Sequence, residues 1–550
     1  MQTKVKLCVF ASLLFFQVYL CAYVCSPATS VFVPGGWEFP VTNVSDAGQA
    51  GRSQVDIDAV GNAIAVWEFG DDGSRVIQTS RYNALTAVWS AVKDLTSLND
   101  ASEPQVAMDE AGNAIAVWVL DDGTNRNIQT SRYTDMWSAV ETLSTATVAG
   151  ESAIQPQVAM DEAGNAIVVW EFYDGSKRDI QASRYNVTTG MWSDEVETLS
   201  TAGAGEYAYG PQVAMDEAGN AISVWMFDDG SNESIQTSRY NVTTGVWSEV
   251  ETLSTADPGI DAAEPQVAMN AAGDAVAVWK LNNGDKGKVQ TKRYSILTDS
   301  WSATEIVLAT SGDDPGVAMD FAGNAIAVWE LEYGDGGEVV QAKRYSVKTG
   351  LWSVSATNLS NFGVNTYDPQ VAMDKIGNAI AVWEFDDGSS RLIQAKRYTV
   401  VADSWSVVPT VLAYSGRDPQ IAMNAAGDAV AVWTCNVDGD KVIQSALYSI
   451  KKKLTAIKKM CRFPTQTDIV NVLYWGPVGT AVKYRIYTDS DLKNILNNDM
   501  LTAGVLIAEV PASKKPFFEH HGRCPEKKVT YHVVPVDIFG QALDSFSITV

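Results

Sequence analysis

Acidic and aromatic side chains stand at the ends of many short apolar runs, where they could contact a ligand. Paired carboxylates can act as general acid and base on a glycosidic bond, and with aromatic rings they could also hold a glycan or a cationic surface without chemistry. The candidate ligand-binding residues are Asp72, Asp122, Tyr173, Asp174, Phe227, Asp229, Tyr333, Asp335 and Asp387. Each position also fits an ordinary solvated Asp-Gly turn, which is the competing interpretation.

Other catalytic chemistry is sparse in this chain. The three histidines, His520, His521 and His532, all lie near the C-terminus, which excludes a histidine-based triad or a histidine-rich metal site from the rest of the chain. No Asp or Glu departs from its repeat in the way a catalytic acid would. We therefore assign no catalytic residue and expect a protein that is not an enzyme.

One unit of 50 to 55 residues recurs eight times and must position these side chains. Its turn glycines are Gly61, Gly112, Gly164, Gly219, Gly273, Gly323, Gly377 and Gly427. Each unit carries four strand-like runs without sustained helical periodicity. The second run, Ala114–Trp118 in one copy, is apolar on both faces, as expected for a strand between two sheets. These features predict an all-β fold, a β-propeller of four-stranded blades.

The two ends of the repeat region complement each other. The last unit lacks the tryptophan that opens the fourth run in the other copies, whereas the segment around Trp37, before the first unit, matches that run. We predict that this N-terminal strand completes the last blade and closes an eight-bladed ring over residues 31–449.

The repeated Asp-x-x-Gly-Asn turn is either structural or a calcium site. Six units place Asp before and Asn after the glycine, as in Asp109 and Asn113. Two units exchange the residue types, as Asn270 with Asp274 and Asn424 with Asp428. One carboxylate and one amide per turn predict a hydrogen-bonded pair. A single carboxylate also offers too few oxygen ligands for calcium, which usually takes several. We expect no cofactor.

The third run repeats Gln-x-x-Arg-Tyr, for example Gln129, Arg132 and Tyr133. Such a set could form one sugar site in each blade. The alternative is a ladder of hydrogen bonds and cation–π contacts along the blade interfaces. Leu447 replaces the arginine in the last unit, which would break a ring of identical sugar sites and favours the ladder.

Export is indicated by the N-terminus. Lys4 and Lys6 precede the apolar run Leu7–Cys25, and cleavage after Ala28 predicts a signal peptide over residues 1–28; an uncleaved anchor is the alternative. Outside this leader remain three cysteines, which permit one disulfide, Cys461–Cys524, with Cys435 free. No later segment is apolar enough to span a membrane, and we expect a secreted or surface protein.

The C-terminal part departs from the repeat. A basic linker over residues 450–460 precedes residues 461–550, whose strand order resembles a fibronectin type III domain with Trp475 as its core tryptophan. The whole resembles secreted or surface bacterial β-propeller proteins built from Asp-x-x-Gly-Asn-Ala…Trp units, often followed by such domains. That resemblance implies the architecture and says little about activity.

The formal net charge of −26 argues against a nucleic-acid partner. In a propeller the invariant turns share one face, and the loops that vary in length and chemistry share the other. We expect a monomeric, exported, non-enzymatic binding or adhesion protein that contacts a glycan or a protein through the variable face. The alternatives are a glycoside hydrolase or lyase with acidic residues on that face, and a structural surface component.

Overall fold

The computed structural model describes residues 36–449, apart from 39–40, 98–99, 145, 255–258, 283–286, 334–336 and 363–364. Beyond this range it describes only the backbone of short strands. The chain divides into two compact units, one of Trp37–Tyr448 and one of Met1–Gly36 with Ser449–Val550. No helix suited to crossing a membrane occurs among the described residues.

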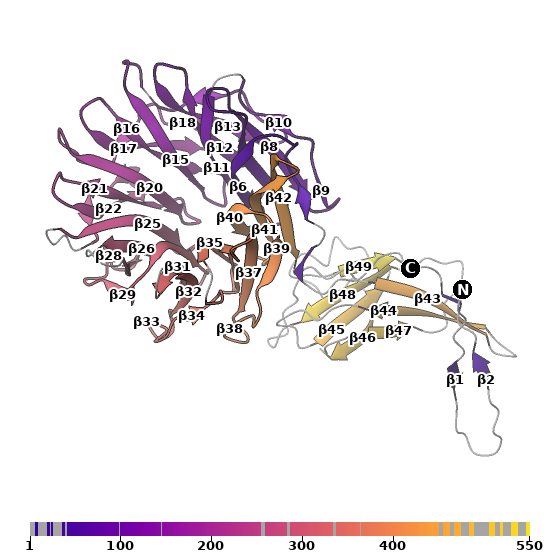
Figure 1. The fold of residues 1–550 in the computed structure, drawn as a ribbon. Helices are drawn as coiled ribbons and strands as arrows, with labels where there is room; N and C mark the ends of the chain where they lie inside the picture. The colour runs from indigo at the N-terminus through magenta and orange to yellow at the C-terminus, as the bar shows by residue number, and fades with distance from the viewer. Residues whose placement is uncertain are drawn as a thin grey trace. The chain divides into compact units, whose positions relative to one another are not determined.

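Antiparallel four-stranded units succeed one another from Trp37 to Tyr448 and stand side by side like the blades of a fan (Figure 1). The first strands are β6 (Ala50–Ile57), β11 (Asp100–Met108), β15 (Ser152–Met160), β20 (Tyr207–Met215), β25 (Asp261–Met269), β30 (Asp313–Met319), β35 (Asn365–Met373) and β40 (Arg417–Met423). The second strands are β7 (Ala63–Phe69), β12 (Ala114–Asp121), β16 (Ala166–Tyr173), β21 (Ala221–Asp228), β26 (Ala275–Asn282), β31 (Ala325–Tyr333), β36 (Ala379–Asp386) and β41 (Ala429–Val437).

The outer strands complete each unit. The third strands are β8 (Val76–Asn83), β13 (Arg126–Tyr133), β17 (Arg178–Asn186), β22 (Glu233–Asn241), β27 (Lys288–Ser295), β32 (Gly337–Ser346), β37 (Arg391–Thr399) and β42 (Asp440–Ser449). The fourth strands are short pieces: β9 (Val88–Trp89) and β10 (Lys93–Asp94), β14 (Glu141–Thr142), β18 (Met191–Trp192) and β19 (Glu197–Thr198), β23 (Val246–Trp247) and β24 (Glu251–Thr252), β28 (Ser300–Trp301) and β29 (Ile306–Ala309), β33 (Leu351–Trp352) and β34 (Thr357–Asn358), and β38 (Ser404–Trp405) and β39 (Thr410–Ala413).

The N-terminal strands close the ring, as predicted. β4 (Gly36–Trp37) and β5 (Thr42–Asn43) pair with β42 and supply the fourth strand of the last unit. The Trp37 ring meets Tyr448 edge-on at 5.6 Å between centroids, the contact that a fourth-strand tryptophan makes in the other units. Each first strand contacts the next one around the ring, and β40 contacts β6. The prediction of an all-β propeller is therefore confirmed.

The core lies between neighbouring second strands. Ile64 and Val66 of β7 pack against Ala114, Ala116 and Trp118 of β12, so large side chains meet small ones across the interface. The tryptophan of each second strand is fully buried, and in most units its indole Nε1 donates to the glutamine of the third strand, as Trp67 does to Gln78 at 3.1 Å. The free thiol predicted for Cys435 is confirmed, and it is buried.

The Arg-Tyr pairs form the predicted interface ladder. Each arginine of the third strand lies over the tyrosine ring of the next unit, at 4.2 to 5.8 Å from the ring centroid. The pairs are Arg81–Tyr133, Arg132–Tyr185, Arg184–Tyr240, Arg239–Tyr294, Arg293–Tyr345, Arg344–Tyr398 and Arg397–Tyr448. These side chains are therefore occupied between blades, in keeping with the structural interpretation over one sugar site per blade.

The repeated turns contain the predicted carboxylate–amide pair. Asn113 Nδ2 donates to Asp109 Oδ2 at 2.6 Å, and the Asn113 backbone N–H donates to Oδ1 at 2.8 Å. All six turns of the Asp…Asn type make the same side-chain bond. Gly112 adopts φ of +88°, a backbone conformation that favours glycine. Each aspartate thus closes its own hairpin.

Backbone strands occur in the other compact unit. Two four-stranded sheets contain β3 (Val24–Cys25), β43 (Thr455–Arg462), β44 (Thr467–Tyr474) and β47 (Phe517–His520), and β45 (Lys483–Thr488), β46 (Val505–Pro511), β48 (Thr530–Val536) and β49 (Phe546–Thr549); β1 (Lys6–Cys8) pairs with β2 (Tyr19–Cys21). The signal peptide 1–28, the linker 450–460, the fibronectin type III-like domain 461–550 and the Cys461–Cys524 disulfide fall here, outside the residues whose side chains are described, and stay predictions.

Replacing Asp216 by alanine should lower the free energy of unfolding by about 2 kcal/mol, because three donors lose their acceptor. These donors are the N–H groups of Ala218 and Asn220 and the Asn220 amide, at 2.8 to 3.0 Å. Urea denaturation measures the loss, and Asp216→Asn should lose less. Excess EDTA should leave the wild-type melting temperature unchanged; a large drop would restore the calcium interpretation of these turns.

Trp37→Ala tests the ring closure. Removing this half-buried ring from Tyr448 should reduce the free energy of unfolding by about 2–3 kcal/mol. Leu85→Ala, at a hairpin tip where the side chain is 94% exposed, is the control and should change nothing measurable. Equal denaturation midpoints for the two variants would mean that β4 does not hold the ring.

Candidate functional site

A β-bulge interrupts the first strand of every unit at the same place. The strand register shifts there, as between Tyr367 and Gln370 in β35. The bulge residue has a left-handed backbone, with φ between +44° and +62°. Residues other than glycine rarely adopt this conformation. The eight bulge residues are Arg52, Glu103, Gln155, Gly210, Glu264, Asp314, Asp368 and Asp418. We call this set the bulge ring.

Carboxylates of the preceding unit hold the bulge ring in this conformation. Buried Glu330 accepts the Asp368 N–H at 2.7 Å, and buried Glu384 accepts the Asp418 N–H at 2.7 Å. Glu68 and Glu171 do the same for Glu103 and Gly210. These glutamates follow the buried tryptophan of the second strand. The strained backbone is therefore held by a hydrogen bond to a carboxyl oxygen across the blade interface.

Four units lack that glutamate, with Val119, Met226, Lys280 and Thr434 in its place. In the units of Val119 and Lys280 the bulge residue itself supplies the carboxylate: Glu103 accepts from Gln155 N–H at 2.7 Å and Glu264 from Asp314 N–H at 3.0 Å. The geometry is thus preserved while the side chain on the ring changes.

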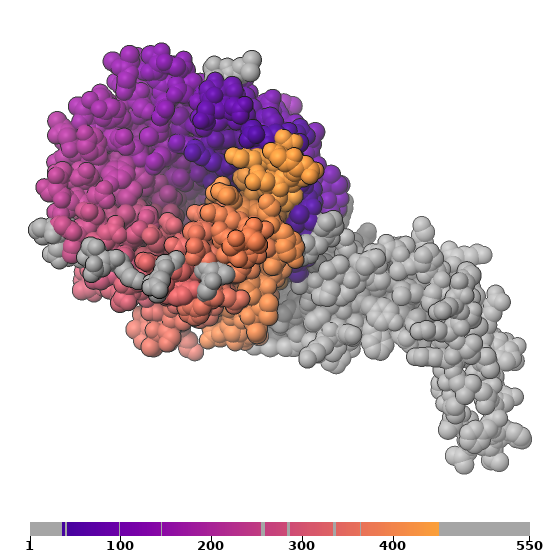
Figure 2. Space-filling view, in the orientation of Figure 1, coloured from indigo at the N-terminus to yellow at the C-terminus, as the bar shows by residue number. Residues whose placement is uncertain are grey.

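Residues of the bulge ring line two cavities beside the first strands of the units. Arg52, Glu103, Gln155 and Asp418 border one of about 420 Å³, together with the prolines and glutamines that follow them. Arg52, Asp368 and Asp418 border a second, of about 690 Å³, among the loops after the second and fourth strands of the first and last units. These units lie side by side in Figure 2, indigo against orange. We call this second cavity the seam cavity.

Three carboxylates meet in the seam cavity. Asp368, Glu384 and Asp418 each bring one oxygen within 4.8 Å of the others. Asp368 is exposed at the cavity wall, yet the partial burial of its carboxyl group, the charge of Glu384 and a hydrogen bond to Glu384 raise its pKa to about 7. Glu384 is 1% exposed and pairs with Arg391 Nη1 at 2.8 Å. A carboxyl group that holds its proton near neutral pH therefore stands beside a carboxylate fixed by arginine, the pattern of an acid–base pair.

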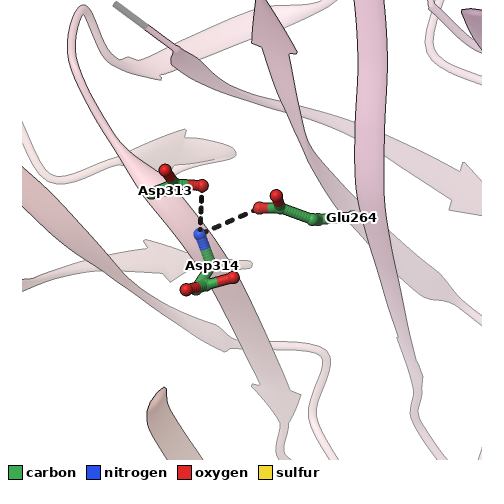
Figure 3. A group of neighbouring side chains, drawn as sticks. All are labelled: Glu264, Asp313 and Asp314. Carbon is green, nitrogen blue, oxygen red and sulfur yellow. Dashed lines mark hydrogen bonds between the residues drawn. The ribbon is translucent and has the colours of Figure 1, made fainter. Parts of the chain in front are cut away.

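A second carboxylate group lies farther along the ring. Glu264, Asp313 and Asp314 converge, and the Asp314 N–H donates to both Asp313 Oδ1 and Glu264 Oε2 (Figure 3). Burial and the charge of Asp313 raise the pKa of Glu264 to about 7. Lys280 Nζ, however, bonds to Asp313 and lies 3.3 Å from Glu264 Oε1. This group is thus largely neutralised, and the seam cavity is the better candidate.

Most residues selected from the sequence serve their own turns. Asp122, Asp174, Asp229 and Asp387 each accept two backbone N–H groups of the following turn, at 2.8 to 3.0 Å. Those hydrogen bonds hold the pKa of Asp122 below its usual range. Tyr173 donates to Gly175 O at 2.9 Å. Such groups are occupied as turn caps.

The remaining candidates are spread over the chain. Tyr333 meets Phe362 edge-on at 4.8 Å, and Phe227 packs against a hydrophobic cluster between blades. Asp335 lies outside the described residues. Asp72 alone borders the seam cavity, with its side chain 96% exposed. The structure therefore does not gather this set into one site.

The sequence does contain a signal for the residues that were missed. The position before the Pro-Gln of the first strand is Arg, Glu, Gln, Gly, Glu, Asp, Asp and Asp in successive units. The residue that follows it is proline in seven of the eight units. Because the backbone there is the same in all units, the varying side chains mark the place where one unit differs chemically from another.

Comparison with known proteins gives remote structural likenesses. No protein-family model and no curated protein matches the chain. The match with the polysaccharide lyase Uly1 covers 77% of this chain and 94% of Uly1, at 9% sequence identity and a TM-score of 0.43. The α-L-arabinofuranosidase Arb93A from Fusarium graminearum covers 57% and 99%, at 12% identity and 0.34. The Hadza microbial sialidase Hz136 covers 60% and 71%, at 12% and 0.34.

These neighbours correct one expectation. They are enzymes that act on carbohydrates, which contradicts the sequence-based reading of a non-enzymatic binding or adhesion protein. At identities of 9 to 12% their activities belong to those proteins alone.

Glu330 makes the stability of the ring depend on pH. Burial, with the charges of Asp314 and Glu338, raises its pKa to about 9. The unfolded chain releases this proton near pH 4.5, whereas the folded protein keeps it until about pH 9. Stability from this group is thus complete below pH 4.5 and falls as the pH rises toward 9.

Glu330→Gln should remove that dependence and keep the acceptor for Asp368 N–H. Relative to wild type we expect a gain of about 1–3 kcal/mol in unfolding free energy at pH 8 and little change at pH 5. Urea denaturation at several pH values measures it. Glu332→Gln, an exposed carboxylate of the same strand, is the matched control. Parallel pH curves for wild type and Glu330→Gln would disprove the assignment.

Proposed function

We propose that the protein is a carbohydrate-active enzyme, a glycoside hydrolase or a polysaccharide lyase, whose acid and base are carboxylates of the seam cavity. The observation that carries the proposal is the meeting of three carboxyl groups at the wall of a cavity of about 690 Å³. Asp368 has one oxygen within 4.8 Å of both Glu384 and Asp418, and these surroundings raise its pKa to about 7. A cavity of this volume can hold a ligand of a few sugar rings.

Each carboxylate has a distinct place in the chemistry. Asp368 carries its proton near neutral pH and can give it to the leaving glycosidic oxygen. Asp418 is exposed and acts as the second carboxylate, either on the sugar or on a proton next to the cleaved bond. Glu384 is occupied by Arg391 and by the Asp418 N–H, so it is a positioning residue whose negative charge keeps Asp368 protonated.

The spacing favours one stereochemical outcome for hydrolysis. Retaining glycosidases hold their two carboxyl groups about 5–5.5 Å apart, and inverting ones about 6.5–9.5 Å apart. One oxygen of each carboxyl group here lies within 4.8 Å of the others, which is below the inverting range and close to the retaining one. If the reaction is hydrolysis, we expect retention of the anomeric configuration.

The wider setting belongs to the same proposal. The apolar N-terminal run supports export, so the enzyme would act outside the cell as a monomer, and its partner would be a polysaccharide. No metal is needed for the proposed chemistry, because arginine already balances the most buried carboxylate of the group.

Asp368→Asn should lower kcat at least about 100-fold, since the amide cannot transfer the proton. Release of reducing ends reports hydrolysis, and absorbance of an unsaturated product reports elimination, over a panel of polysaccharides. Wild-type activity in the hydrolysis assay should fall as the pH rises through about 7, where Asp368 loses its proton.

Glu103→Gln is the matched control, because it changes the same repeat position in another unit. It should keep activity near that of wild type. Turnover by Asp368→Asn equal to that of wild type would refute the assignment of the acid. No turnover of any polysaccharide by the wild type would refute the enzyme itself.

A further inference from the structure

The seam cavity gathers cations in a strongly acidic protein. The formal net charge is −26, yet five cationic side chains border this one cavity. They are Arg52, Arg75, Arg391, Arg417 and Lys441. Five carboxylates border it as well, and they neutralise some of these cations.

Two of the five cations have structural partners. Arg75 binds Asp100 through two parallel bonds, at 2.6 and 3.0 Å, and lies 3.4 Å from Glu68. Arg391 is held by Glu384 at 2.8 Å. The same contacts occupy the cavity carboxylates Glu68 and Glu384. These pairs are therefore closed to a ligand.

Three cations keep donors free. Arg417 and Lys441 are exposed, and no carboxylate of the described residues lies within ion-pair distance of either. Arg52 is 60% exposed and touches Glu68 at 3.3 Å through one of its nitrogens. A guanidinium has five N–H donors in a planar fork that matches a carboxylate. These side chains can therefore receive an anionic group.

The repeat does not require a cation at the positions of Arg52 and Arg417. At the bulge position, Arg52 is the one cation among eight residues, and at the position before it Arg417 is again the one cation. The residues that correspond to Arg417 are Gly51, Ser102, Ile154, Tyr209, Ala263, Asp313 and Tyr367. A residue needed to build a blade would recur in the other blades. These two arginines depart from the repeat where its first and last units meet.

Ring closure brings the three cations to the acid–base group. Arg52 lies on β6, whereas Arg417 and Lys441 lie on β40 and β42 of the last unit, which contacts β6. Gln49 and Lys441 form a backbone bridge across the seam. Arg417 directly precedes Asp418 in the chain. An anion held here would thus lie beside the carboxylates that we propose to act on the glycosidic bond.

We propose that Arg52, Arg417 and Lys441 form a subsite for the carboxylate of an acidic sugar, so that the substrate class is a carboxylated polysaccharide. This inference rests on the proposed function of the same cavity. Asp72 and Asp418 would repel an anion, and the subsite must therefore bind through direct hydrogen bonds rather than through a general positive field. Asp368, in its protonated form, adds no opposing charge.

Binding to matched polysaccharides tests the subsite. Polygalacturonate, alginate and hyaluronan would each be compared with its carboxyl-reduced, neutral derivative by affinity electrophoresis and calorimetry, using full-length Asp368→Asn so that nothing is cleaved. We expect at least one carboxylated polymer to bind at least 10-fold more tightly than its reduced form. Raising the salt concentration should weaken that binding, because exposed charges are screened.

The double variant R417A/K441A, in the same background, should lose at least 10-fold in affinity for that polymer. Arg126→Ala is the matched control: Arg126 corresponds to Lys441 in another unit, pairs with Asp121 at 3.1 Å, and lies outside the cavity. It should bind as the parent does. Unchanged melting temperatures would show that both variants are folded.

The outcomes separate this inference from the proposed function. Equal binding of carboxylated and reduced polymers, or full affinity in R417A/K441A, overturns the subsite. Turnover of a neutral polysaccharide, unaffected by R417A/K441A, overturns it as well and leaves the enzyme intact. Selective binding of a carboxylated polymer that the wild type never cleaves supports the subsite and refutes the proposed reaction.

Discussion

The second strand of each unit is apolar on both faces, and every other feature of the ring depends on that. A sheet of this kind is stable only between two others, so each blade needs a neighbour on both sides. A linear stack would leave two uncovered faces. Closing the ring removes them, and the N-terminal strand on β42 completes the last sheet. The buried tryptophans and the Arg–Tyr ladder then act between blades that are already forced together.

Closure has a chemical consequence at the inner strands. The bulge in each first strand exposes a backbone N–H toward the preceding blade, and a carboxylate of that blade accepts it in most units. Carboxylates are thus drawn into a confined space for structural reasons. Where several meet, as at Asp368, Glu384 and Asp418, burial and mutual repulsion keep one of them protonated near neutral pH. Glu384, which holds the bulge backbone, therefore stands beside Asp368, the group that can transfer a proton.

The same arrangement separates scaffold from specificity. The bulge backbone is common to all units, whereas its side chain changes from Arg to Glu, Gln, Gly or Asp. A change of side chain there alters the lining of the cavities and leaves the hydrogen bonds of the backbone in place. The seam between the first and last units departs furthest from the repeat, because it joins two termini that have no counterpart elsewhere in the ring.

Local sequence pattern was enough to establish the blades. Strand number, the hairpin turns with their Asp–Asn pairs, the interface ladder and the closing N-terminal strand follow from spacing and residue type, because each depends on neighbours within one or two units. The candidate site did not follow. Arg52 and Asp418 are far apart in the chain, and only ring closure brings them to one cavity. The proton on Asp368 depends on burial and on charges from other strands. The aspartates of the loop tips looked like ligand groups, but their own turns use them. The sequence alone specified the strands and turns of each blade. The tertiary structure determined which side chains of different blades meet, because only the closed ring brings residues far apart in the chain together.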